Sequence, residues 1–122
     1  MNHLTFQIEY IKTSLLEMIE LVKSQFEKSS EALLNHDLEL AEEIIRREAR
    51  VNALELNLYK ECEQNIALYQ PVASELRLLI STIKSVSELE RIGDHAVFVA
   101  KSLVDFQHKP FSKQYIESFF IC

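Results

Sequence analysis

The fold is decided by residues 71–106, PVASELRLLISTIKSVSELERIGDHAVFVAKSLVDF. Residues spaced alternately four and three apart along this stretch are mostly apolar: Val72, Leu76, Leu79, Ile83, Val86, Glu90, Gly93, Val97, Ala100 and Val104. A second apolar line lies beside it, made of Leu78, Leu89, Ile92, Ala96, Val99 and Leu103. A helix with apolar residues on two lines has to be covered by two neighbouring elements. The stretch therefore predicts a long helix packed against two others.

Two further helical segments precede it, at about residues 4–34 and 38–69. The first has apolar residues at steps of three and four, with Leu4, Ile8, Ile11, Leu15, Met18, Val22, Phe26 and Leu33 as its members. The second has an apolar stripe of Ala41, Ile44, Ile45, Val51, Leu54, Leu58, Tyr59, Cys62 and Ile66. Asp37 is suited to cap the start of the second helix, and Pro71 to end it near residue 69 and open the third near 71. Short connections make successive helices antiparallel, so the prediction is an all-α, antiparallel three-helix bundle.

The composition agrees with this prediction. The chain has one glycine and two prolines among 122 residues, and none of the three occurs in the first seventy. Hairpins and Gly-rich phosphate loops need these residues, so most β and α/β architectures are disfavoured.

Charge and hydropathy exclude several classes of function. With 13 basic and 19 acidic residues the net charge is −6, which disfavours nucleic acid or anionic lipid as the main partner. No window is apolar enough to predict a membrane span, and the first residues lack a basic signal region. Cys62 and Cys122 make no disulfide framework, and Cys62 is predicted to be a small core residue. The predicted location is the cytoplasm.

The helical pattern stops after Phe106. We therefore divide the chain into a three-helix bundle, residues 1–106, and a tail, residues 107–122. The tail carries Phe111, Tyr115, Phe119 and Phe120, whose spacing predicts the start of a fourth helix. Such an apolar segment needs a cover, either the bundle itself or another subunit. This is a reason to expect a dimer.

Polar side chains interrupt the apolar faces of two helices. In the third helix, Glu90 occupies a step of the 4-3 series, and Asp94 lies one turn further along the same face. In the second helix, Glu48, Asn52 and Glu55 lie on a 4-3 line through the apolar stripe. Each of these helices therefore places acidic or amide groups on or beside its packing face.

Four of these residues fall at one level in an antiparallel pair. Glu48, Asn52, Glu90 and Asp94 are all 18 to 24 residues from the predicted turn near residue 70, or about 30 Å at roughly 1.5 Å of rise per residue. Carboxylates gathered in this way repel one another and resist removal from water, so the site needs a cation. Oxygen ligands suit Mg²⁺, Mn²⁺, Ca²⁺ or iron rather than a structural Cys/His zinc. The prediction is a metal site of these four residues, with Glu55 as an additional candidate ligand.

The same spacing also allows a solvated edge without metal. In that arrangement Glu90 pairs with Arg91 or Arg50, and Glu48 faces water. Gly93, which costs about 1 kcal/mol relative to alanine inside a helix, prompts the hypothesis that it leaves room for a neighbouring helix or for bound ions.

Three stretches carry a resemblance to the PhoU family. They are PVASELR at residues 71–77, ELERIGDHA at residues 88–96 and RVNALE at residues 50–55. The resemblance covers about residues 4–106. The chain resembles one three-helix repeat of a family whose members normally have two in tandem, and Asn52 stands where a carboxylate is often found.

The resemblance implies a cytoplasmic regulator of phosphate uptake that is not an enzyme. Such proteins act by contact on a phosphate ABC transporter, including its ATPase, and on a phosphate-sensing histidine kinase, and they restrain both when phosphate is plentiful. Arg77 and Arg91 are candidate partner contacts.

The family's metal-binding motif corresponds here to Glu90 and Asp94, and its counterpart in the second helix to Glu48 and Asn52. The implied cofactor is iron, Mg²⁺, Mn²⁺ or Zn²⁺, in a mononuclear or multinuclear site. A single repeat implies either a homodimer that rebuilds the two-repeat body or a truncated copy with reduced function.

Two other functions are open to a helical chain of this kind. A di-iron carboxylate enzyme needs Glu-x-x-His motifs on two helices, and no Glu of this chain has a His three residues further on. The other is a scaffolding bundle without metal, which composition alone does not separate from the metal-binding regulator.

Overall fold

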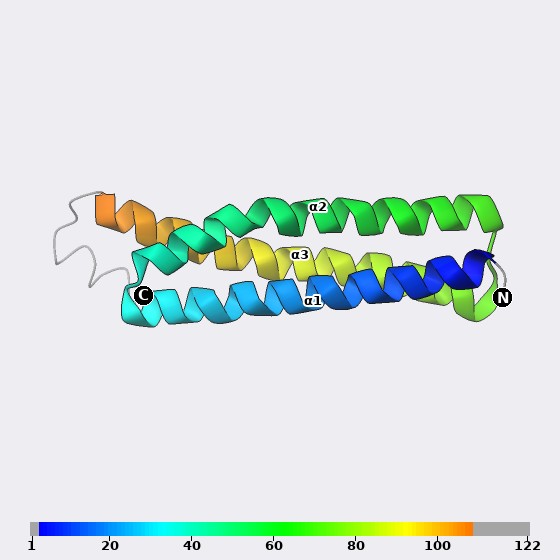
Figure 1. The fold of residues 1–122 in the computed structure, drawn as a ribbon, viewed down its shortest axis with the longest axis horizontal. Coiled ribbons are helices and arrows are strands. Elements are labelled where there is room, and N and C mark those ends of the chain that lie inside the picture. Colours follow the sequence, from blue (N-terminus) through cyan, green and yellow to red (C-terminus); the bar gives the residue numbers. More distant parts are fainter. Residues whose placement is uncertain (1–2, 109–122) are drawn as a thin grey trace.

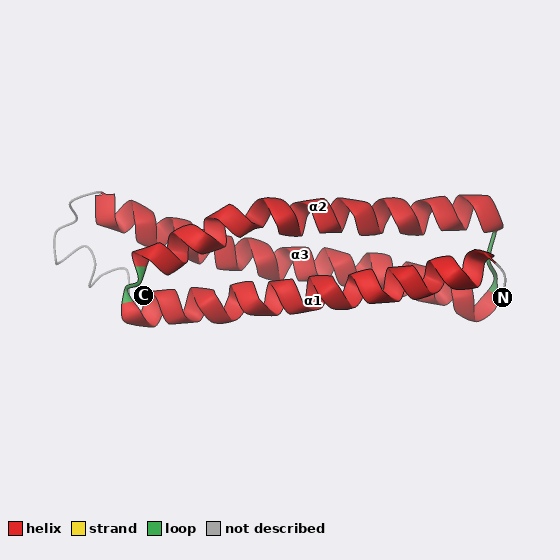
Figure 2. Cartoon of the chain, viewed as in Figure 1, coloured by secondary structure: helices red, strands yellow, loops and turns green. Residues whose placement is uncertain are grey.

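The computed structural model describes residues 3–108, which form three helices joined by short turns. Helix α1 spans His3–Asn35, α2 spans Leu38–Tyr69 and α3 spans Ala73–His108. The three lie side by side along their lengths and alternate in direction (Figure 1), and between the short turns the described chain is helical throughout (Figure 2). The predicted antiparallel three-helix bundle is confirmed. Within residues 3–108, no helix has a stretch long and apolar enough to cross a lipid bilayer.

The turn between α1 and α2 follows the predicted capping chemistry. The Asp37 side chain accepts a hydrogen bond from the Leu40 N–H at 3.1 Å, which satisfies one of the free amides at the start of α2. The Asp37 N–H donates to the Ala32 carbonyl at 3.0 Å and so closes the end of α1.

The second turn differs from its prediction at one point. Helix α3 begins at Ala73 rather than at Pro71, and Val72 is 75% exposed instead of packed. The reason is that Gln70 adopts the left-handed conformation, φ 44° and ψ 55°, and its N–H caps α2 on the Ile66 carbonyl at 3.1 Å. Reversing the chain in this way takes residues 70–72 out of the helices. At its other end, α3 continues two residues beyond the predicted boundary at 106, and the predicted fourth helix lies outside the described residues.

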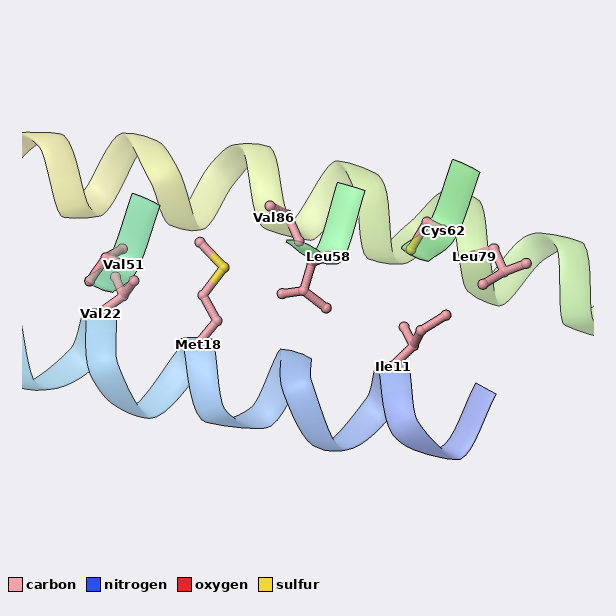
Figure 3. Close-up of a cluster of buried hydrophobic side chains, with 8 residues drawn as sticks. All are labelled: Ile11, Met18, Val22, Val51, Leu58, Cys62, Leu79 and Val86. Atoms are coloured by element: carbon pink, nitrogen blue, oxygen red, sulfur yellow. The ribbon is translucent and has the colours of Figure 1, made fainter. Parts of the chain in front are cut away.

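The core consists of two hydrophobic clusters, one after the other along the bundle. The longer one contains Ile11, Met18, Val22, Val51, Leu58, Cys62, Leu79 and Val86, whose side chains meet between the three helices (Figure 3). The second contains Ala32, Ala41, Ile44, Val97, Ala100 and Leu103. Cys62 is fully buried, as predicted.

Helix α1 departs from the predicted apolar stripe in its second half. Phe26 and Leu33 are 55% and 44% exposed, while the buried positions after Val22 are Gln25, Ser29 and Ala32. The buried series keeps to alternate steps of four and three, whereas Phe26 lies one position, about 100°, around the helix from Gln25. Packing geometry therefore decides burial here, and residue type does not.

Gly93 lies on the buried side of α3, facing α1 and α2. A Cβ atom built on it would lie 3.9 Å from Val51 Cγ1 and 4.0 Å from Val22 Cγ2, which are ordinary van der Waals distances. A methyl group therefore fits beside the neighbouring helices, so their approach does not by itself call for glycine, and the alternative that Gly93 leaves room for bound ions stays a prediction. A larger side chain would meet both valines.

We predict that Gly93→Ala raises the free energy of unfolding by about 0.5–1 kcal/mol, because alanine has the higher helix propensity. Gly93→Leu is expected to lower it by about 1–3 kcal/mol through overpacking. Urea denaturation in the presence of a chelator measures both. If the alanine variant were less stable than the unchanged chain, the conclusion that a methyl group fits at this position would be wrong.

Candidate metal centre

All five predicted metal ligands line one pocket. Helix α2 contributes Glu48, Asn52 and Glu55, and α3 contributes Glu90 and Asp94. The space inside it that the centre of a water-sized sphere can reach is only about 10 Å³. The antiparallel hairpin of α2 and α3 therefore brings these side chains to one level, as the distances from the turn predict.

The pocket interrupts the hydrophobic core. Its remaining walls are Gln25 of α1, Val51 of α2, and Gly93 and Val97 of α3. Val51 belongs to the longer hydrophobic cluster and Val97 to the other. We call the polar residues that line this pocket the polar level of the bundle: Gln25, Glu48, Asn52, Glu55, Glu90 and Asp94. The polar level lies where the two clusters meet, and all three helices contribute to it.

The acidic side chains lie at graded depths. Glu55 is only 9% exposed, Glu48 and Glu90 are half-buried, and Asn52 and Asp94 are exposed. The pocket therefore has a buried carboxylate at its base and polar oxygens towards water. Such a gradation lets an ion enter while the inner ligand stays desolvated.

Glu55 is the acidic residue whose pKa this arrangement changes most. Burial, the hydrogen bond with Glu90, and the negative charges of Glu90 and Asp94 together raise its pKa to about 7, with burial the largest cause. Burial also raises the pKa of the neighbouring Tyr59 phenol, against the opposing effect of its hydrogen bond to Ser87. Glu55 therefore keeps its proton up to about neutral pH, beside the carboxyl group of Glu90.

The basic residues nearby pair elsewhere. Arg91 lies 3.7 Å from Glu88, and Arg50 lies 3.2 Å from Glu17. The alternative in which Arg91 or Arg50 neutralises Glu90 is therefore wrong. Within residues 3–108, no ion pair involves Glu55, Glu90 or Asp94.

Glu48 is the exception among the acidic residues of the pocket. Its Oε2 atom lies 3.8 Å from Lys101 Nζ, and about a third of its side chain is exposed. A pair as exposed as this contributes little to stability. It does mean that Lys101 competes with any cation for Glu48.

The carboxylates do not form a finished coordination shell. Across residues 3–108, no three Asp, Glu, His or Cys side chains converge closely enough to hold one ion as they stand. Rotamer changes, amide oxygens or water would have to complete a site. The donors nevertheless suit a hard cation, because they are carboxylate and amide oxygens without basic partners at Glu55, Glu90 and Asp94.

Sequence reasoning missed Gln25. Its side chain is 2% exposed, lines the pocket from α1 and donates from Nε2 to the Ile44 carbonyl at 2.9 Å. The available signal was the regular spacing of α1, because steps of four and three from Leu4 reach residue 25. The apolar residue Phe26, which directly follows Gln25, obscures this spacing because apolar residues are normally the buried ones.

The other candidate residues lie outside the pocket. Arg77 and Arg91 are exposed on α3, so they are accessible to a partner, which leaves their predicted role untested.

Comparison with known proteins places this geometry in a family. The sequence profile of the PhoU domain matches residues 15–103, which include every residue of the pocket. The chain belongs to the PhoU family. The three-helix fold, the profile match and the resemblance of residues 50–55, 71–77 and 88–96 agree.

Members of the PhoU family from several bacteria are similar to the chain. A phosphate-specific transport system accessory protein PhoU homolog of Aquifex aeolicus is 36% identical over 110 residues, covering 90% of this chain and 50% of that protein. The accessory protein PhoU of Escherichia coli is 35% identical over 107 residues, covering 85% and 44%. The chain thus spans about half the length of the curated relatives it matches.

A solved structure of the PhoU family shows the same fold. The phosphate transport system regulatory protein PhoU from Streptococcus pneumoniae superposes with a TM-score of 0.77 at 28% identity. The match covers 95% of this chain and 55% of the other.

We predict that Glu55 makes the metal-free bundle less stable as pH rises. Between about pH 4.5 and 7 the folded state holds the Glu55 proton more tightly than the unfolded state, so the free energy of unfolding falls across this range and stays low above it. Glu55→Gln, measured by urea denaturation with a chelator, should raise it by about 1–3 kcal/mol at pH 8 and by little at pH 4.5.

Glu63→Gln is the matched control, since Glu63 is an exposed carboxylate on the same helix. It should change stability by less than about 0.5 kcal/mol. Glu55→Gln with the pH dependence of the unchanged chain would show that Glu55 is not the group responsible.

Proposed function

We propose that this chain regulates phosphate uptake by binding the proteins that carry it out. Its partners are a phosphate ABC transporter, including the ATPase, and a phosphate-sensing histidine kinase, which it restrains when phosphate is plentiful. The observation that carries the proposal is the PhoU-domain match over residues 15–103. Relatives named as accessory proteins of phosphate-specific transport support it.

The pocket between α2 and α3 is proposed to bind a metal ion. Glu48, Asn52, Glu55, Glu90 and Asp94 would hold iron, Mg²⁺, Mn²⁺ or Zn²⁺, in a mononuclear or multinuclear site. A bound cation would supply positive charge to a pocket where the carboxyl groups of Glu55 and Glu90 face each other. Because its ligands come from two helices, occupancy would hold α2 and α3 in register.

Regulation is proposed to occur by contact in the cytoplasm, without catalysis. Arg77 and Arg91 are exposed on α3 and are the proposed partner contacts. Arg91 is also paired with Glu88 at 3.7 Å, an exposed pair that costs little to exchange for a partner's carboxylate.

A homodimer is also part of the proposal. A groove between α1 and α3 has Ile19, Leu89 and Ile92 among its lining residues, and Ile92 is 42% exposed. Apolar side chains grouped in this way favour association. A second copy would bring two three-helix units together.

A second candidate is a metal-free scaffolding bundle, or a truncated copy with reduced function. The observation in its favour is that, in the part of the chain described, no three acidic, His or Cys side chains converge as they stand. The two candidates differ in whether chelation changes the protein.

The metal site predicts a difference in metal content. The purified chain should contain metal or take it up, and Glu90→Gln combined with Asp94→Asn should lose most of it, because both oxygen ligands from α3 are weakened. Elemental analysis and the melting temperature with and without chelator measure this. Glu88→Gln combined with Asp105→Asn, which alters α3 carboxylates that do not line the pocket, is the matched control. Equal metal content in the two double variants would contradict the assignment.

The regulatory function predicts a phosphate phenotype. Deleting the gene in its own organism should raise phosphate uptake in phosphate-rich medium, because the restraint is lost. Restoring the gene should reverse this, and restoring it with Arg77→Glu should do so less well. Uptake that is unchanged by the deletion would favour the scaffold or the truncated copy.

The dimer predicts a particle of twice the 14.2 kDa chain mass in light scattering. Ile92→Glu should shift it towards the monomer, because a charge enters the apolar groove. Phe98→Glu is the control, since Phe98 is an exposed apolar residue of α3 outside that groove. A monomer in all three proteins, or a dimer unaffected by Ile92→Glu, would contradict this interface.

A further inference from the structure

The polar level of the bundle contains a buried amide whose oxygen has no partner. Gln25 of α1 is 2% exposed and lines the same pocket as Glu55 and Glu90. Its Oε1 atom makes no hydrogen bond, although it is shielded from solvent. Leaving a buried acceptor unsatisfied costs about 1–3 kcal/mol, so the position calls for a partner that arrives from the pocket.

The orientation of this amide is fixed by its other half. Nε2 donates to the backbone carbonyl of Ile44 on α2 at 2.9 Å. That carbonyl can only accept, so exchanging the amide oxygen and nitrogen would place two acceptors against each other. Oε1 is therefore the atom of the Gln25 amide that lacks a hydrogen-bond partner, and Gln25 is one of the residues that line the pocket.

The surroundings offer acceptors rather than donors. The polar side chains that share the pocket with Gln25 carry carboxyl or amide groups, and the carboxyl groups of Glu55 and Glu90 hydrogen-bond to each other. The nearby lysines are engaged, Lys28 with Glu43 at 3.2 Å and Lys101 with Glu48 at 3.8 Å. A carbonyl oxygen next to carboxylates is instead the type of ligand that completes an oxygen-rich cation site.

We propose that Gln25 Oε1 is a neutral ligand, contributed by α1, to the cation held by α2 and α3. This inference rests on the proposed metal site and deepens it, because a third helix joins the coordination. It supplies a donor that the acidic residues lack as they stand. Binding would then fix all three helices relative to one another, and the stability of the bundle would rise with the logarithm of the cation concentration once that exceeds the Kd.

The test compares Mn²⁺ binding by calorimetry, and Fe²⁺ binding under anaerobic conditions, in the full chain and its variants. Gln25→Met keeps the length of the side chain but removes the oxygen, and it should raise the Kd about tenfold. Gln25→Glu also loses the hydrogen bond to Ile44 but keeps the oxygen, and it should bind at least as tightly as the unchanged chain. The contrast between these variants separates coordination from structural support.

The chain provides a matched control in Asn65. It is 3% exposed, its Oδ1 is also unpartnered, and its Nδ2 donates to the Glu61 carbonyl at 2.7 Å, but it does not line this pocket. Asn65→Leu should leave the Kd unchanged. If Gln25→Met binds as tightly as the unchanged chain while the Glu90/Asp94 double variant does not bind, the Gln25 proposal is overturned and the metal site stands. If the unchanged chain takes up neither ion, both proposals fall.

A measurement on the unchanged chain covers the case in which Gln25→Met does not fold. In the side-chain amide region of an NMR spectrum, saturating Mg²⁺ should shift the Gln25 NH₂ pair and leave the Asn65 pair in place. An unmoved Gln25 signal in protein that binds Mg²⁺ by calorimetry would overturn the proposal.

Discussion

Two carboxyl groups, Glu55 and Glu90, face each other where α2 packs against α3, and no basic side chain of the described bundle pairs with either. Burial and mutual repulsion make it unfavourable for both to be ionised. Glu55 keeps its proton up to about neutral pH for this reason, and the proposed cation would relieve the same repulsion. This one constraint links the pocket, the division of the core into two clusters and the proposed sensitivity of the bundle to pH and to metal.

The fold supplies a scaffold on which such a pocket can be tolerated. Fully buried side chains such as Met18 and Leu58 lie in the longer cluster, and Ile44 and Ala100 lie in the other. Apolar packing on both sides holds the backbone while the polar level between them remains unsatisfied.

The features that could be predicted from the sequence are those set by residues close together along the chain, and the features that could not are set by packing between helices. Helix type and turn positions follow from local spacing and capping, and Asp37 caps α2 as predicted. The level of the acidic residues also follows, since the rise per residue and the turn fix it. The start of α3 was misplaced by two residues because the left-handed Gln70 that reverses the chain has no local signal. The exposure of Phe26 was missed because hydrophobic type does not determine which side of a helix packs.

The sequence by itself determined an all-α bundle, its order and the family, because these depend on periodicity and on contiguous motifs. Only the tertiary structure decided that Glu55 is the deepest acid, that Arg50 and Arg91 turn to other partners and that Gln25 brings a third helix to the pocket. Those facts depend on how three helices are rotated about their axes. A rotation of a helix by one residue position moves each side chain by about 100° around the axis and can take it from the core into solvent. The rotation of each helix is fixed by packing across the whole bundle rather than by any single segment.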